Sequence, residues 1–168
     1  MILEVALDAD PEWDSSSDWP RLAQAAAEAA IAESAFPQLG QAGRPVEISL
    51  RLGTDAEVHA LNVEWCGKDG PTNVLSFPMA EAEALAGAAE AGPELMLGDI
   101  ILARGVCAAE AADKAISIDQ HAAHLMVHGT LHLLGHDHLD DSSAGDMEAR
   151  EVRALARLGI ADPYRAGR

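Results

Sequence analysis

The 168-residue chain has few aromatic side chains and only two cysteines. Cys66 and Cys107 are too few for a disulfide framework, and they lack the Cys-x-x-Cys spacing of a redox motif. This use of cysteine is typical of proteins in a reducing compartment. We therefore expect a cytoplasmic protein whose core does not depend on disulfides.

Long hydrophobic runs are also missing. No stretch approaches the roughly 18 to 20 apolar residues that a membrane-spanning helix needs, and the N-terminal segment lacks the basic region and long apolar run of a secretory signal. We therefore expect no membrane partner. A length of 168 residues with 49% hydrophobic content suits one globular domain, and we assign residues 1–168 to it.

Basic side chains are scarce: 11 lysines and arginines stand against 28 aspartates and glutamates, which gives a net charge of -17. Such a charge repels nucleic acid, so a polyanionic substrate would need a local basic patch. Arg150, Arg153 and Arg157 have helical spacing and could form one. The alternative, which we favour, is a solvated helix face on which these arginines pair with Glu148 and Glu151.

Histidine, by contrast, is concentrated in one place, because six of the seven histidines lie between positions 121 and 138. His128 and His132 are four residues apart, so a helix brings both imidazoles to one face. Gly135 can end that helix in the left-handed conformation, and the chain can then turn back so that His138 supplies a third nitrogen. The spacing predicts one Zn²⁺ per chain, with a fourth position open for water as in catalytic zinc sites.

The pattern matches the zinc-protease motif His-Glu-x-x-His-x-x-Gly-x-x-His except at position 129, where glycine replaces the general-base glutamate. Gly129 therefore argues against peptidase chemistry. A zinc ion would still make its bound water more acidic and polarise a carbonyl or phosphoryl oxygen, so other hydrolytic reactions stay open. The competing interpretation is that these histidines are ordinary core or surface residues.

Four neighbouring residues have two interpretations each. His121 and His124 continue the histidine stripe, either as packing residues or as groups that orient a ligand imidazole. His136 is either a proton donor near the metal or a solvated turn residue. Asp137 either accepts a hydrogen bond from a ligand histidine or shapes the turn.

Hydrophobic periodicity and turn residues predict an α+β fold, with a small mixed sheet of about four strands packed against several helices and a mostly buried histidine helix. Residues 80–93 have no apolar period and are expected to form a loop, in part helical. The expected strands are 2–7, 46–51, 74–77 and 95–103, and the expected helices are 20–35, 54–65, 105–116, 119–134 and 142–158.

Several segments resemble the YbeY family of bacterial endoribonucleases. The most specific are the histidine motif and the loop-strand sequence Gly-Lys-Asp-Gly-Pro-Thr-Asn-Val-Leu-Ser-Phe-Pro at 67–78. Weaker matches are Leu-Asn at 61–62, Leu-Gly-Asp-Ile at 97–100 and Leu-Gly-Ile-Ala-Asp-Pro-Tyr at 158–164.

The resemblance implies that His128, His132 and His138 hold zinc in a metal-dependent endoribonuclease. It also implies single-stranded RNA as substrate, a role in maturation of the 3' end of 16S rRNA, and a part in ribosome quality control. The expected partners are the small ribosomal subunit and its assembly factors, and DNA is not expected.

The family pattern usually places arginine before Gly-Lys-Asp, whereas this chain has Cys66. An arginine there would bind phosphate bidentately, which a thiol cannot do. Lys68 can hold the phosphate in its place, or it is a solvated loop residue. Cys66 could instead be an additional soft zinc ligand. The alternative function is a ribosome-assembly or ribosome-binding factor with a mainly structural zinc and little hydrolytic activity.

Overall fold

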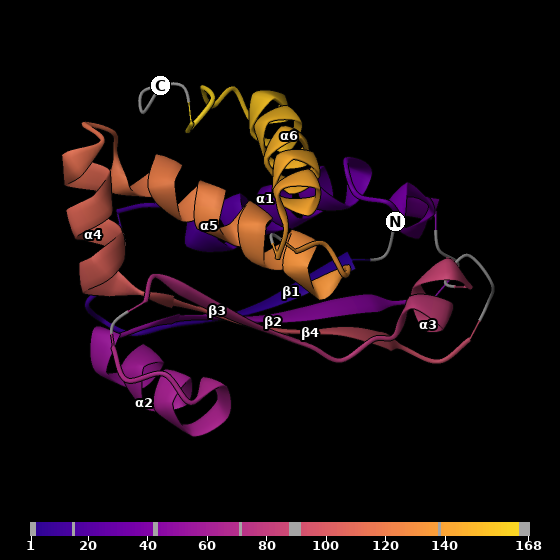
Figure 1. Cartoon of the computed structure of the whole chain (residues 1–168), viewed down its shortest axis with the longest axis horizontal. Helices are drawn as coiled ribbons and strands as arrows, with labels where there is room; N and C mark the ends of the chain where they lie inside the picture. The colour runs from indigo at the N-terminus through magenta and orange to yellow at the C-terminus, as the bar shows by residue number, and fades with distance from the viewer. Residues whose placement is uncertain are drawn as a thin grey trace.

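The computed structural model describes residues 3–14, 16–41, 44–70, 72–87, 92–137 and 139–164. A four-stranded sheet lies between helices on its two faces (Figure 1). The strand order is β1-β2-β4-β3; β1, β2 and β4 are parallel, while β3 runs antiparallel to β4. The predicted mixed sheet is therefore confirmed. Its strands are β1 (Leu3–Ala9), β2 (Val46–Gly53), β3 (Val74–Pro78) and β4 (Leu95–Ala103).

The helices form two unequal layers. In Figure 1, α1 and α5 lie above the sheet, α6 lies beyond them, and α2 lies below the sheet. Helix α5 packs against α1, α4, α6, β3 and β4, so it occupies the centre of the larger layer. The helices are α1 (Trp19–Ala32), α2 (Asp55–Cys66), α3 (Ala82–Ala86), α4 (Arg104–Asp113), α5 (Ile118–Leu133) and α6 (Asp141–Arg157), with a short 3-10 helix η1 (Pro37–Gln41).

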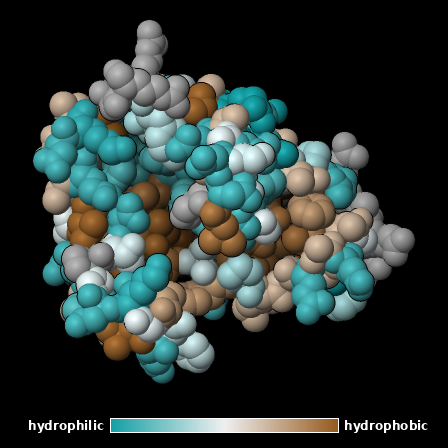
Figure 2. Space-filling view, in the orientation of Figure 1, coloured by the Kyte–Doolittle hydropathy of each residue, from teal (hydrophilic) through white to brown (hydrophobic). Residues whose placement is uncertain are grey.

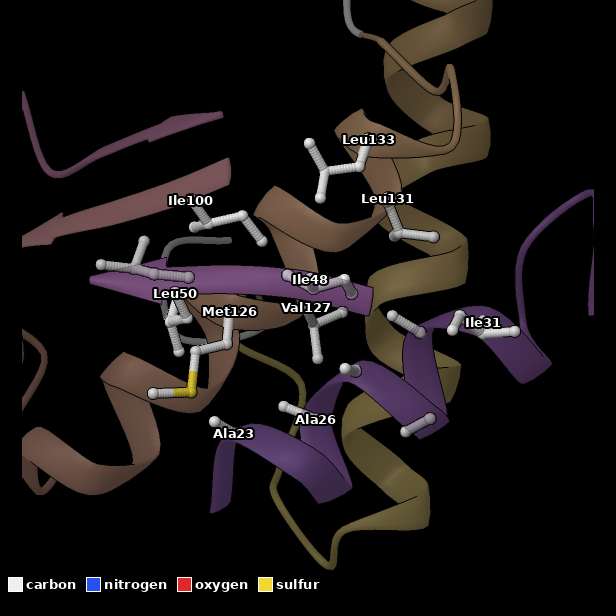
Figure 3. Packing of buried hydrophobic residues seen from close by; sticks show 14 of the residues in the cluster. Ala23, Ala26, Ile31, Ile48, Leu50, Ile100, Met126, Val127, Leu131 and Leu133 are labelled. Atoms are coloured by element: carbon white, nitrogen blue, oxygen red, sulfur yellow. The ribbon is translucent and has the colours of Figure 1, made fainter. Parts of the chain in front are cut away.

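The main core lies between the sheet and the α1–α5 layer. Figure 3 shows Met126 and Val127 of α5 close to Ile48 and Leu50 of β2, with α1 on their far side. Helix α1 is rich in alanine on its buried face, and small side chains let two helices approach closely. This packing buries most side chains of α5, as the sequence predicts.

A separate, smaller cluster lies on the opposite face of the sheet, under α2. Val58 of α2 packs there with Ile101 and Ala103 of β4. Thr54 and Glu57 form the capping box expected at the start of α2: the Thr54 side chain accepts from the Glu57 N–H, and the Glu57 carboxylate accepts from the Thr54 N–H. Helix α2 is thereby fixed beside the sheet, with the following loop at the edge formed by β3.

One irregularity in β4 determines how closely α5 approaches the sheet. The register between β2 and β4 shifts beside Glu47 and Ile48, and Gly98 of β4 has φ +144°. A Cβ at position 98 would collide with the Phe77 carbonyl oxygen and lie 2.8 Å from Leu133 Cδ2 of α5. Only glycine allows both neighbours to come this near.

The predicted elements are found with small shifts at their ends. Helix α4 ends at Asp113, before the predicted residue 116, and η1 was not anticipated. The expected loop at 80–93 contains the short helix α3. No helix within the described part of the chain is long and apolar enough to cross a membrane. Figure 2 shows hydrophilic residues over most of the helical layer and hydrophobic patches across the middle of this face.

Candidate metal centre

Helix α5 brings His128 and His132 together. The Ser117 hydroxyl caps the helix by accepting the Gln120 N–H, and the chain leaves the helix through Gly135 with φ +90°. One turn apart, the two rings have centroids 4.6 Å apart, and their Nε2 atoms are 3.1 Å apart. Two imidazole nitrogens thus converge on one point, as their spacing predicts.

The third predicted ligand, His138, lies outside the described residues. Among the residues that are described, no three His, Cys, Asp or Glu side chains form a group that could hold an ion. Cys66 lines the same cavity as His128 and His132 but does not complete such a group. The geometry therefore does not place the Cys66 thiol as an additional ligand.

The histidine pair opens onto a cavity of about 540 Å³ between α5, the end of α2 and β3. Its wall is mostly polar, and of the described residues that form it, Lys68 alone is cationic. The lining residues are Asn62, Cys66, Lys68, Asp69, Gly70, Thr72, Asn73, Val74, Leu75, Ser76, His128 and His132.

A buried carboxylate orients His128 from behind. Glu151 of α6 is only 1% exposed, and its Oε1 lies 2.9 Å from His128 Nδ1. A carboxylate that binds the far nitrogen of an imidazole is common around metal ligands, because it fixes the ring and its tautomer. The sequence offered Asp137 as a partner for a ligand histidine; at His128 the structure places Glu151.

Glu151 is surrounded by donors. His124 Nε2 lies 3.1 Å from its Oε1, and the Tyr164 hydroxyl donates to its Oε2 at 2.7 Å. Burial by itself would raise the pKa of Glu151, but the hydrogen bonds from His124 and His128 outweigh it and lower the pKa to about 2. Burial next to this carboxylate raises the pKa of Tyr164. Glu151 is therefore ionised and Tyr164 keeps its proton.

A second carboxylate-imidazole pair lies near the start of α5. His121 Nε2 is 2.8 Å from Glu110 Oε1 of α4, and the same oxygen accepts from Asn73 Nδ2 at 3.0 Å. Burial lowers the pKa of His121, although Glu110 opposes this. Since Asn73 lines the cavity, this pair connects α4 and α5 to the cavity wall without touching His128 or His132.

Comparison with known proteins places these features in a family. Residues 11–159 match the family model described as "Endoribonuclease YbeY". The chain belongs to the YbeY family. It is 51% identical to Endoribonuclease YbeY of Rhizorhabdus wittichii over 164 residues, which cover 97% of each chain. It is 52% identical to Endoribonuclease YbeY of Novosphingobium aromaticivorans over 160 residues, covering 94% of this chain and 93% of the relative.

The fold also has a counterpart among solved structures. The solution structure of TM1509 from Thermotoga maritima superposes with a TM-score of 0.54, covering 99% of this chain and 95% of that one. The two sequences are 16% identical, so this likeness concerns the fold alone.

The Gly-Lys-Asp segment at 67–69 forms a loop held by α2. Gly67 ends α2 with φ +66°, and the Lys68 N–H donates to the Asn62 carbonyl at 3.2 Å. His59 Nε2 lies 2.7 Å from Asp69 Oδ1, and Asn62 Nδ2 donates to the Gly70 carbonyl. These contacts hold the loop so that Lys68, which is exposed, lines the cavity; the sequence offers phosphate binding or a solvated loop position for it.

His136 lies apart from the cavity lining described above. Its Nε2 accepts the Ala35 N–H at 3.1 Å, and burial lowers its pKa. These contacts attach the turn after α5 to the end of α1. Asp137 Oδ1 accepts the Leu139 N–H at 3.3 Å. This local contact is of the kind expected if Asp137 shapes the turn.

The glycine that separates this YbeY protein from zinc proteases faces the sheet. A Cβ at position 129 would lie 3.0 Å from Ile100 Cγ2 of β4. A glutamate there would meet Ile100 and lie against the sheet. Gly129 therefore packs against the sheet, and the close approach of α5 to β4 disfavours a long side chain there.

The sequence interpretation missed Glu151 and assigned it to the arginine stripe. That pairing is wrong, since Arg153 Nε and Arg157 Nε bind the Glu33 carboxylate at 2.9 and 2.7 Å. A signal was present: Glu151 lies four residues from both Met147 and Leu155, on the apolar stripe of α6. A charged residue at such a position needs a buried partner.

Proposed function

We propose that the chain is a zinc-dependent endoribonuclease that cuts single-stranded RNA in the cytoplasm. Its substrate would be the 3' end of 16S rRNA, and its partners the small ribosomal subunit and assembly factors, including those of ribosome quality control. The observation that carries the proposal is the convergence of His128 and His132 on a polar cavity, in a chain whose relatives are named endoribonucleases.

The donor set fits Zn²⁺. Imidazole nitrogen is a preferred zinc donor, and His128 has the carboxylate on its far nitrogen that such ligands commonly have. His128 and His132 would hold the ion together with His138. When bound, zinc supplies Lewis-acid polarisation of a phosphoryl oxygen and makes a water more acidic.

The chain's own residues would bind and orient the RNA. Lys68 would bind the scissile phosphate, because it is the cationic side chain among the described residues of the wall. Thr72 and Ser76 would offer hydroxyls to the sugar-phosphate backbone from the same wall.

A second function is favoured by Cys66. It lines the cavity where the family pattern usually has arginine, so the described wall offers one cation to the phosphate instead of two. A protein with such a site could keep its metal and its folded structure and still cleave RNA poorly. The protein would then act as a ribosome-assembly factor with a mainly structural zinc.

The test is cleavage of a labelled RNA that carries the 3' region of small-subunit RNA, as a single strand and as a duplex. Zinc-loaded wild-type protein should cut the single strand, and His132→Ala, with folding checked by circular dichroism, should not. No cleavage by wild-type protein with one zinc per chain would favour the assembly factor. Equal cleavage by His132→Ala would refute the role of this metal site in cleavage.

A further inference from the structure

Three donors meet on the two oxygens of Glu151. His128 Nδ1 and His124 Nε2 share Oε1, at 2.9 and 3.1 Å, and the Tyr164 hydroxyl takes Oε2 at 2.7 Å. Glu151 itself is 1% exposed, so its carboxylate is hydrogen-bonded by these protein donors and not by bulk water. A buried carboxylate in this position fixes the proton on each group that faces it.

The protons can be assigned from geometry. The Tyr164 hydroxyl has one proton, and it points to Glu151 Oε2. His124 Nε2 lies within 3.2 Å of the Tyr164 oxygen and 3.1 Å of Glu151, whereas its Nδ1 is buried with no hydrogen-bond partner among the described residues. Neutral His124 therefore carries its proton on Nε2.

The same reasoning applies to His128. Its Nδ1 faces the carboxylate and must donate, so a neutral His128 presents the lone pair of Nε2 toward His132 Nε2. Zinc can bind only an unprotonated imidazole nitrogen. The network thus selects the tautomer that points the correct nitrogen at the metal position.

Tyr164 lies beyond residues 11–159, which match the family model, yet it belongs to this network. Its ring packs edge-on against His124 with centroids 5.4 Å apart, and the Asp162 carboxylate accepts the Tyr164 N–H at 2.8 Å. We propose that Glu151 and Tyr164 are positioning residues of the metal centre. Glu151 selects the tautomer of His128, and Tyr164 holds Glu151 in place from the C-terminal segment.

This inference rests on the proposed zinc site and is tested by affinity for Zn²⁺ alone. The dissociation constant would be measured by competition with a chromophoric chelator for wild type, Glu151→Gln and Tyr164→Phe. Glu151→Gln should weaken zinc binding by about 10- to 100-fold, as loss of such a partner commonly does. Tyr164→Phe keeps the ring and removes one hydrogen bond, so it should weaken binding by about fivefold.

Glu110→Gln is the matched control, because it alters the other Glu-His pair on α5, in which His121 is buried and Glu110 is partly exposed, and which does not touch His128. It should leave zinc affinity unchanged. Long-range ¹⁵N NMR of the histidine rings adds a readout that a purely structural role would not move. In the zinc-free wild type His128 should be the Nδ1–H tautomer, and in Glu151→Gln it should become a mixture.

The outcomes separate the two proposals. Tight zinc binding by wild type, with equal affinity in Glu151→Gln and Tyr164→Phe, would overturn the positioning role and leave the zinc site standing. Failure of wild type to bind zinc would overturn the zinc site and this inference together. Weakened binding that Glu110→Gln reproduces to the same extent would also overturn it, because the effect would then not depend on contact with His128.

Discussion

Gly129 of α5 lies so close to Ile100 of β4 that a Cβ on residue 129 would come within 3.0 Å of Ile100 Cγ2. This contact brings the histidine helix onto the sheet. It also explains why the position that is glutamate in zinc proteases cannot carry one here.

Substitution of Gly129 should show a steep dependence on side-chain size. Gly129→Ala should change the free energy of unfolding by less than about 1 kcal/mol, because better helix propensity offsets the tight contact with Ile100. Gly129→Glu should lower it by at least about 3 kcal/mol, since it places a charge against the sheet. Urea unfolding measures both. A stable Gly129→Glu protein with peptidase activity would contradict this packing role.

Removal of the metal should abolish RNA cleavage reversibly. A chelator should stop cleavage, and added Zn²⁺ should restore it. His128 and His132 supply only the nitrogens that would bind the ion, and the Lewis-acid chemistry would come from the ion itself. His132→Ala should lose zinc and activity without recovery. His59→Ala is the control for zinc content, since this histidine binds Asp69 on the surface and is not a predicted ligand; it should bind as much zinc as the wild type. Full activity in chelator would refute the metal requirement.

Lys68 and Cys66 should have opposite effects on cleavage rate. Lys68→Ala should reduce kcat/KM by about 10²-fold, if the lost phosphate contact resembles an oxyanion-stabilising donor. Cys66→Arg should raise it about tenfold or more, since a guanidinium can bind the phosphate bidentately. Lys68→Arg is the control for charge. Unchanged kinetics in both Lys68→Ala and Cys66→Arg would mean that this wall does not bind the scissile phosphate.

The ion pairs of Glu33 with α6 should weaken at acid pH. The hydrogen bond from Arg157 lowers the pKa of Glu33, and Arg153 contributes to the same effect. The stabilisation of the folded protein by ionised Glu33 is therefore fully present above the unfolded-state pKa near 4.5. It is lost as pH falls through the lowered folded-state pKa. Glu33→Gln should cost about 1 kcal/mol at pH 7, and the difference from wild type should vanish at strongly acid pH. A difference that stays constant with pH would exclude an ionic origin.

His136 should contribute to stability. His136→Ala removes the acceptor of the Ala35 N–H and should lower the free energy of unfolding by about 1 to 2 kcal/mol. The rate of single-turnover RNA cleavage at low temperature should then be nearly unchanged. The sequence-based prediction of a proton donor gives the reverse pattern, a large fall in rate with little loss of stability. Measuring both quantities on one preparation decides between the two.

The local features of the fold could be predicted because they depend on neighbouring residues. The capping box at Thr54, the helix end near Gly135 and the shared face of His128 and His132 all follow from spacing along the chain. Even β4 could be assigned from its apolar run, with the bounds that the structure shows.

The contacts that hold the site in place from other helices could not be predicted, because they depend on which elements meet in space. Glu151 is 23 residues from His128 in sequence, and Glu33 is 124 residues from Arg157. Spacing alone does not show that α6 packs on α5 or that its arginines reach the end of α1. The position of Glu151 on an apolar stripe was the available signal for burial, but it does not name the partner.

The closeness of His128 and His132 in sequence also affects how zinc binding would couple to folding. A ligand stabilises the native state only by the difference between its affinities for the folded and unfolded chains. Two histidines four residues apart stay near each other even in an unfolded chain, so unfolded molecules would compete for the ion. Only the folded chain also brings Glu151 to His128. Zinc should therefore raise the melting temperature by less than its native-state affinity alone implies, and a refolding chain can acquire the ion before α6 has docked.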